Sequence, residues 1–224
     1  MKVRMTSHST PDNIIGVDDA QELIAYCARV SNPGNQNNKD TSEKLIKYLI
    51  KHQHWSPLEM VSACLEIETT RDIARQILRH RSFSFQEFSQ RYADPTKAMS
   101  FQSREARLQD PTNRQNSIPL DFDIESQRRL NEEFRMKQHA LWRESEKIYN
   151  WAIDKGIAKE QARVVLPEGM TISRLYMNGT LRSWVHYIDL RSANGTQKEH
   201  QDIAIACAHE IAQIFPLMKD ISNV

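Results

Sequence analysis

The sequence is poor in residues that break or cross-link a chain: its 224 residues include six glycines, eight prolines and three cysteines. So few glycines and prolines exclude a collagen-like or low-complexity chain. The number of cysteines is odd, and Cys27, Cys64 and Cys207 are widely spaced. This pattern excludes a disulfide framework and a Cys-x-x-Cys metal site. Such cysteine usage is typical of a reducing compartment, so we expect a cytoplasmic protein.

The chain also lacks long apolar runs and an excess of charge of either sign. No apolar run approaches the roughly 20 residues of a membrane span, and residues 1–6 are too polar for the core of a signal peptide. The formal net charge is +1 and the mean hydropathy is −0.64. These values give no support for bulk electrostatic binding to nucleic acid or membrane. The composition is that of an ordinary globular protein, and we expect a single domain over residues 1–224.

Hydrophobic periodicity predicts a mixed α and β chain that is rich in helix. Residues 60–69 alternate, with Val61, Leu65 and Ile67 on one side, as in a strand with one buried face. The same patterns predict a second strand over 171–177 and helices over 18–30, 40–51, 71–80, 122–155, 159–165, 180–190 and 198–215. The heptad-like apolar steps of the helix over 122–155 fit either a core or an oligomer seam. Residues 94–121 are polar and hold three prolines, which predicts a long surface excursion.

The densest chemical feature is an arginine-rich segment. Five arginines lie between residues 71 and 91, against only Asp72 and Glu87, and the segment continues to Tyr92. Guanidinium groups suit phosphate and carboxylate ligands because they present several donors in one plane. The alternative is an arginine-rich helix end that is simply solvated, as most charge runs are.

Four blocks of this sequence resemble one enzyme family. Arg79-His80-Arg81, followed after seven residues by Ser89, matches the RHR-x7-S signature of flavin-dependent thymidylate synthases. Residues 54–59, 162–167 and 181–191 are similar to three further segments of that family. All four blocks occur in the family order over roughly residues 25–215, which is far more specific than a single RHR triplet.

The resemblance implies a fold and an activity. The implied fold is α/β (α+β), with a central, largely antiparallel sheet flanked by helices. The implied reaction is the methylation of dUMP to dTMP, with 5,10-methylenetetrahydrofolate as carbon donor and NADPH as the reductant of a bound FAD. The resemblance also implies a homotetramer whose active sites use residues of several subunits.

Site residues follow by matching positions. The resemblance makes Arg191 the catalytic residue, which meets the uracil and favours its N3-ionised form, because a nearby cation stabilises an anion. The implied dUMP contacts are Gln76, Arg79, Glu87, Ser89, Gln90, Arg91, Arg163 and Arg191. Those from Glu87 to Arg91 are expected in a loop around the phosphate and sugar. The implied FAD contacts are Ser31, His54, Ser56, Glu59, Arg79, His80, Arg81, Glu87, Thr180, Arg182 and His186.

Some positions depart from the family pattern. Gln86 and Thr180 stand where asparagine is frequent, and residues 195–197 replace a stretch that often bears histidine. No Gly-x-Gly-x-x-Gly turn occurs, so a Rossmann fingerprint does not hold the FAD. The three cysteines fall on apolar helix faces or within a strand, so we expect packing residues rather than an activated thiolate.

Two other functions compete with this interpretation. His52, His54 and Glu59 suggest a metal-dependent hydrolase, but the histidines lack the His-Glu-x-x-His spacing, so no metal site is expected. The second is a nucleic-acid-binding module in which Phe83, Phe85, Phe88 and Tyr92 stack bases between arginines. The near-neutral net charge argues against it, and neither nucleic acid nor membrane is an expected partner.

Overall fold

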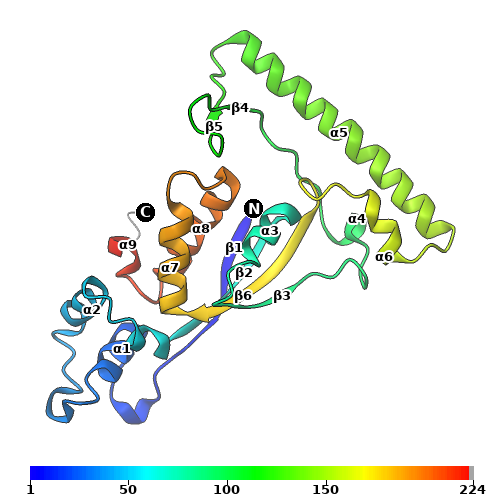
Figure 1. Ribbon diagram of the computed structural model, residues 1–224. Coiled ribbons are helices and arrows are strands. Elements are labelled where there is room, and N and C mark those ends of the chain that lie inside the picture. The colour runs from blue at the N-terminus through cyan, green and yellow to red at the C-terminus, as the bar shows by residue number, and fades with distance from the viewer. Residues whose placement is uncertain (222–224) are drawn as a thin grey trace.

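The computed structural model describes residues 1–221, and an antiparallel sheet lies at its centre (Figure 1). The strand order is β1-β2-β6-β3, and every neighbouring pair is antiparallel. The strands are β1 (Lys2–His8), β2 (Ser62–Thr70), β6 (Ile172–Thr180) and β3 (Ser84–Glu87). This confirms the expected antiparallel sheet and the strands predicted near 60–69 and 171–177.

One face of the sheet carries the hydrophobic core. Leu65 of β2 lies opposite Met177 of β6, and both are fully buried. Helices α7 (Leu181–Ser192) and α8 (Lys198–Ile211) contribute to the same core. The buried Trp184 of α7 donates its indole N–H to the Ala63 carbonyl oxygen at 3.0 Å, which ties the helix to β2. The alternation of apolar residues in the sequence therefore marks this face correctly.

The opposite face of the sheet is polar. Glu66 of β2 accepts hydrogen bonds from the Tyr176 hydroxyl at 2.8 Å and from Arg4 at 3.1 Å. Next to it, Arg174 of β6 pairs with Glu68 at 2.5 Å. These cross-strand pairs satisfy charged groups on a face that alternation alone would assign to solvent.

Within residues 1–221, seven other α-helices surround or extend this core. They are α1 (Ala20–Ala28), α2 (Ser42–Lys51), α3 (Arg71–Ile77), α4 (Pro95–Ala98), α5 (Glu125–Asp154), α6 (Lys159–Ala162) and α9 (Met218–Ile221). In Figure 1, α1 and α2 lie together at one end of the sheet, whereas α5 stands well away from it. Among these helices, none has both the length and the apolar composition needed to cross a membrane.

The long helix α5 buries a different stripe from the heptad-like one. Its buried residues are Gln138, Trp142, Ser145, Tyr149 and Ala152. Of these, Trp142, Tyr149 and Ala152 form a small second core with Ala162 and Leu166. Leu130, Phe134, Leu141 and Ile148 are between 39% and 55% exposed. These four heptad-like residues are therefore not core residues of this chain, whereas Ala152 is.

The excursion over residues 94–121 is ordered rather than irregular. It contains α4 and a two-stranded hairpin, β4 (Arg107–Gln109) and β5 (Ser117–Pro119). Asp110 organises the hairpin turn by accepting hydrogen bonds from Thr112, Asn113 and Asn116. These hydrogen bonds, first of all the one from the Thr112 hydroxyl, hold the pKa of Asp110 well below its usual range.

Candidate active site

The RHR triplet lies in the turn between α3 and β3. Arg79 and Arg81 are exposed, and within residues 1–221 neither forms an ion pair. The turn is anchored by Phe83, whose buried ring packs edge-on against Trp184 with ring centroids 4.8 Å apart. Gly179 of β6 makes room for this ring, because a Cβ at that position would lie 2.4 Å from Phe83 Cδ1. The two arginines thus reach outward from a turn that the core holds in place.

The middle residue of the triplet points inward instead. His80 packs edge-on against Tyr187 of α7, and its Nε2 accepts a hydrogen bond from Arg191 Nε at 2.9 Å. Burial, followed by the neighbouring Arg191 and Arg79 cations, lowers the pKa of His80 to about 4. His80 is therefore neutral near pH 7, as an acceptor from a guanidinium must be.

The expected dUMP residues fall into two groups in one chain. Gln76, Arg79 and Arg191 gather where the C-terminal ends of α3 and α7 meet the start of α8. The second group follows β3 and comprises Glu87, Ser89, Gln90, Arg91 and Arg163. Within residues 1–221, no hydrogen bond or ion pair joins a side chain of the first group to one of the second.

Glu87 corrects one expectation about the second group. It is the last residue of β3, paired with Leu175, and not part of a loop. Its carboxylate accepts a hydrogen bond from the Ser173 hydroxyl at 2.7 Å and lies 3.5 Å from the Arg71 guanidinium. A four-residue edge strand is too short to produce a periodic signal, so the sequence pattern did not reveal it.

A cavity of about 280 Å³ adjoins this group. It is lined by Arg71, Arg75, Gln90, Glu160, Arg163, Val164, Leu166 and Glu168. Gln90 is 4% exposed, and among the described residues its buried amide nitrogen Nε2 has no hydrogen-bond partner. Arg163 lies beside it and forms no ion pair in the described part of the chain. An unpartnered amide donor and an uncommitted guanidinium are suited to an oxyanion such as a phosphate.

Neighbouring side chains control the charge of this cavity. Arg75 forms a two-point ion pair with Glu168, with both donor–acceptor distances at 2.5 Å. This pairing lowers the pKa of Glu168. At the rim, Arg91 pairs with Glu160 at 3.0 Å, and its backbone N–H donates to the Ser89 hydroxyl oxygen at 3.3 Å. Arg71, Arg75 and Glu168 are not among the residues that the family resemblance implies, although both arginines belong to the arginine-rich segment of the sequence.

The expected FAD residues are spread over a third region and the RHR turn. Arg182 of α7 pairs with Glu59, and His186 lies one turn further along, 4.4 Å from the Trp55 ring. Ser31, in the loop after α1, is exposed. His54 and Ser56, in the segment 54–59, are exposed as well. Thr180 is the N-cap of α7, and its hydroxyl oxygen accepts from the Ser183 N–H at 3.3 Å.

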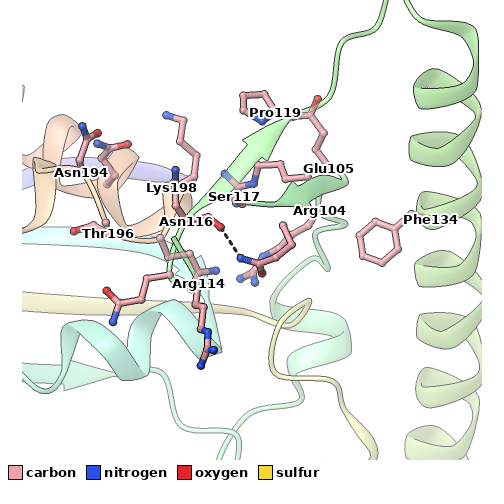
Figure 2. Close-up of a pocket in the computed structure, with 16 residues that line it drawn as sticks. Arg104, Glu105, Arg114, Asn116, Ser117, Pro119, Phe134, Asn194, Thr196 and Lys198 are labelled. Atoms are coloured by element: carbon pink, nitrogen blue, oxygen red, sulfur yellow. Dashed lines mark hydrogen bonds between the residues drawn. The ribbon is translucent and has the colours of Figure 1, made fainter. Parts of the chain in front are cut away.

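A second cavity, of about 560 Å³, lies at the β4–β5 hairpin, and none of the expected site residues lines it. Figure 2 shows Asn116, Ser117 and Pro119 of the hairpin facing Asn194 and Thr196, with Phe134 of α5 on the other side. Much of its positive charge is already paired. Arg104 pairs with Asp72 at 2.7 Å, and Arg107 and Lys198 pair with Glu199 and Asp202.

The structure also bears on the two competing functions. Over residues 1–221 there is no group of three or more His, Cys, Asp or Glu side chains placed to hold a metal ion. Glu59 is engaged with Arg182, and the His52 and His54 rings are 6.3 Å apart. Phe83 is a core residue, so it is not available to stack on a nucleobase.

Comparison with known proteins gives consistent matches. Residues 13–217 match the family model described as thymidylate synthase complementing protein. A probable flavin-dependent thymidylate synthase of Paramecium bursaria Chlorella virus 1 is 48% identical over 216 residues, covering 96% of both chains. The flavin-dependent thymidylate synthase of Synechocystis is 48% identical over 218 residues, again covering 96% of both chains.

A solved structure supports the fold. The UMP/dUMP methylase PolB from Streptomyces cacaoi, bound with 5-Br dUMP, matches with a TM-score of 0.76. The match covers 99% of this chain and 94% of that chain at 24% identity. At this level of identity the likeness shows a shared fold.

Proposed function

This chain belongs to the family of thymidylate synthase complementing proteins, and we propose that it is a flavin-dependent thymidylate synthase. The proposed reaction is the reductive methylation of dUMP to dTMP. Its proposed co-substrates are 5,10-methylenetetrahydrofolate and NADPH. The observation that carries the proposal is the 48% identity, over 96% of this chain, to proteins with that activity in their names.

We propose that the first residue group recognises the base of dUMP. His80 occupies Arg191 Nε, so the two terminal nitrogens of that guanidinium, which have no hydrogen-bond partner within residues 1–221, are available to donate toward the uracil oxygens. A cation there stabilises the N3-ionised form of the base and so prepares C5 for bond formation. Gln76 and Arg79 complete this group from α3.

The second residue group is suited to the phosphate and sugar. Gln90 brings a buried donor without a partner, and Arg163 brings a guanidinium without an ion pair. Arg91 pairs with Glu160 and Glu87 lies 3.5 Å from Arg71, and both of these partners line the same cavity. Ser89 accepts a hydrogen bond from the backbone N–H of Arg91, and Ser173 holds the Glu87 carboxylate. This set matches the needs of a phosphomonoester, which offers several acceptor oxygens to arginine forks.

The residues present also fit an FAD. Arg81 is exposed and forms no ion pair with any described residue. Exposed hydroxyl and imidazole groups at Ser31, His54, Ser56 and His186 supply further polar contacts. These are the donors that a pyrophosphate and a polar ring edge require. When bound, the flavin supplies the hydride chemistry, and the protein binds and orients the reactants. Arg182 and Thr180 complete the proposed contacts, with Thr180 already serving as a helix cap.

We also propose the homotetramer with shared active sites. The separation of the dUMP residues into two unconnected groups supports it, because a neighbouring subunit can bring the missing group. Large exposed apolar side chains support it as well: Val164 is 83% exposed and Tyr92 is 84% exposed beside the second group. The exposed apolar stripe of α5 provides a further surface of the kind that oligomers cover.

Two of the three cysteines lack the features of a catalytic nucleophile. Cys207 is completely buried, and burial raises its pKa far above the usual range. Burial also raises the pKa of Cys27. All three thiols are free, which agrees with the proposed cytoplasmic location.

An absorbance spectrum with added FAD and then dUMP tests the proposed function first. We expect oxidised-flavin bands that elute with the protein and shift when dUMP is added. Formation of dTMP should then require methylenetetrahydrofolate and NADPH. A folded protein that takes up no FAD, or one that binds FAD but is insensitive to dUMP, would contradict the proposal.

A further inference from the structure

A buried histidine lies behind the expected substrate residue Gln76. His200, in the first turn of α8, is 0% exposed. Its Nδ1 lies 3.3 Å from Gln76 Oε1, and its Nε2 lies 3.2 Å from the Tyr187 hydroxyl. Both ring nitrogens therefore have a single partner each, and neither reaches solvent.

The hydrogen bonds continue from Gln76 in the other direction. Gln76 Nε2 donates to Gln197 Oε1 at 2.8 Å, and Gln197 Nε2 donates to Glu199 Oε2 at 2.9 Å. Glu199 also pairs with Arg107 of the β4–β5 hairpin. One chain of contacts thus runs from Tyr187 to the hairpin and passes through Gln76.

The negative charge of Glu199 sets which group donates and which accepts in every hydrogen bond of this series. An ionised carboxylate such as Glu199 only accepts hydrogen bonds, so Gln197 must present its NH₂ group to it. The side-chain oxygen of Gln197 then faces Gln76, so Gln76 must donate its own NH₂ group to that oxygen. The oxygen of Gln76 consequently faces His200, which must carry its proton on Nδ1 and accept from Tyr187 at Nε2.

We propose that His200 is a positioning residue that holds the Gln76 amide in the one orientation set from Glu199, and so keeps a single end of that amide toward the substrate. The proposal rests on the proposed function, in which Gln76 contacts dUMP. An amide that is free to turn by 180° presents donor and acceptor to a ligand interchangeably, whereas a held amide presents one pattern. We call the hydrogen-bonded series from Tyr187 to Glu199 the relay. It selects a nucleotide whose donors and acceptors match that single pattern.

The relay also gives a role to the hairpin in residues 94–121. Arg107 neutralises and holds Glu199, the group from which the direction of the chain starts. Arg107 and Gln197 both line the 560 Å³ cavity, so the outer end of the relay is reached from solvent there. The fold therefore connects a surface hairpin to a residue of the substrate group through partly buried hydrogen bonds and one ion pair.

Two substitutions of His200 separate positioning from packing. In His200→Asn, the side-chain amide lies as many bonds from the backbone as Nδ1 and retains a donor for Gln76. In His200→Gln, the amide lies near the position of Nε2 and reaches Tyr187 instead. Both variants remove the ring from the same buried place, so a purely structural role predicts similar losses in both.

We expect the two variants to differ in substrate binding. The Kd of dUMP, measured by the flavin spectral shift, should rise about tenfold in His200→Gln and no more than about twofold in His200→Asn. The KM for dUMP should follow the Kd while kcat per bound flavin is kept. Equal effects of the two variants, whether both large or both negligible, would overturn the proposal.

The tautomer provides a test that needs neither variant nor activity. In wild-type protein labelled with ¹⁵N-histidine, we expect His200 to carry its proton on Nδ1 and to have an unprotonated Nε2. A proton on Nε2 would overturn the proposed direction. If wild-type protein fails to bind dUMP, the proposed function fails, whereas this spectrum still decides the direction of the relay.

Discussion

Arg191 donates its Nε–H to Nε2 of His80 at 2.9 Å, so a neutral imidazole holds the guanidinium that we assign to the base of dUMP. The contact joins the middle of the RHR triplet to the last arginine of the C-terminal block, which are 111 residues apart in the chain. It aligns the guanidinium while leaving its terminal nitrogens free. The two sequence blocks thus act on one another, and not only on a ligand.

Removal of this guanidinium should affect turnover far more than cofactor binding. We expect Arg191→Ala to lower kcat for dTMP formation by about 100-fold or more, the usual cost of losing a charge-stabilising group. FAD content should stay near one per chain, as read from the visible spectrum. Arg135→Ala, an exposed position on α5, serves as the matched control and should keep its activity. Unchanged turnover in Arg191→Ala would remove the assigned role.

The unpartnered amide of Gln90 should lower the free energy of unfolding and strengthen the binding of dUMP. Gln90→Met keeps the side-chain length and removes a buried donor, so we expect the free energy of unfolding to stay equal or to rise by about 1 kcal/mol. The Kd of dUMP should rise about tenfold at the same time. Urea unfolding and a dUMP titration measure the two effects, with the exposed Gln213→Met as control. Wild-type affinity in Gln90→Met would show that Gln90 does not contact the nucleotide.

The glycine beneath Phe83 should be needed for the RHR turn. Gly179→Ala places a methyl group 2.4 Å from a ring carbon, so the ring and the turn before it must shift. We expect a loss of about 1–3 kcal/mol in the free energy of unfolding and weaker FAD binding. Gly169→Ala is the control, because its Cβ meets nothing nearer than Asp72 Oδ2 at 3.9 Å. Equal stability of the two variants would contradict the close approach.

The cysteines should be dispensable for chemistry. The triple variant Cys27→Ala, Cys64→Ala and Cys207→Ala should form dTMP at the wild-type rate per bound flavin. Its free energy of unfolding should fall by about 1 kcal/mol, mainly because Cys207 is fully buried. Activity is normalised to flavin absorbance so that lost folding is not counted as lost catalysis. An inactive variant that is folded and loaded with FAD would contradict a mechanism without a thiolate.

Mild acid should destabilise the fold through two histidines. The pKa is about 4 for His80 and about 3 for His200 in the folded chain, against an ordinary value near 6.5 in the unfolded chain. Below about pH 6.5 the unfolded chain therefore binds protons that the folded chain does not. The resulting stabilisation is complete above that pH and is lost as the pH falls toward these lower values.

Urea unfolding between pH 7 and pH 5 measures this effect. Each buried histidine contributes a slope of up to about 1.4 kcal/mol per pH unit once the pH is well below 6.5. His200→Asn, which has no titrating ring, should lose the share of the slope due to His200. A stability that is independent of pH over this interval would show that both rings are free to protonate in the folded state.

Local patterns in the sequence determined much of this protein. The alternation over residues 60–69 marked β2 and its buried face, and the long helix was visible as α5. The RHR-x7-S signature and its three companion blocks indicated the family, because they consist of short runs of neighbouring residues. Such features are encoded in local spacing, which a single sequence displays directly.

Only the tertiary structure decided how those parts meet. His200 lies on the inward stripe of α8 with Ile203 and Cys207, a pattern that suggests burial but gives no partner. Its contact with Gln76 spans 124 residues, and β3 becomes a strand only by pairing with β6, which lies far along the chain. Contacts of this kind depend on the packing of distant segments, and no local periodicity carries that information.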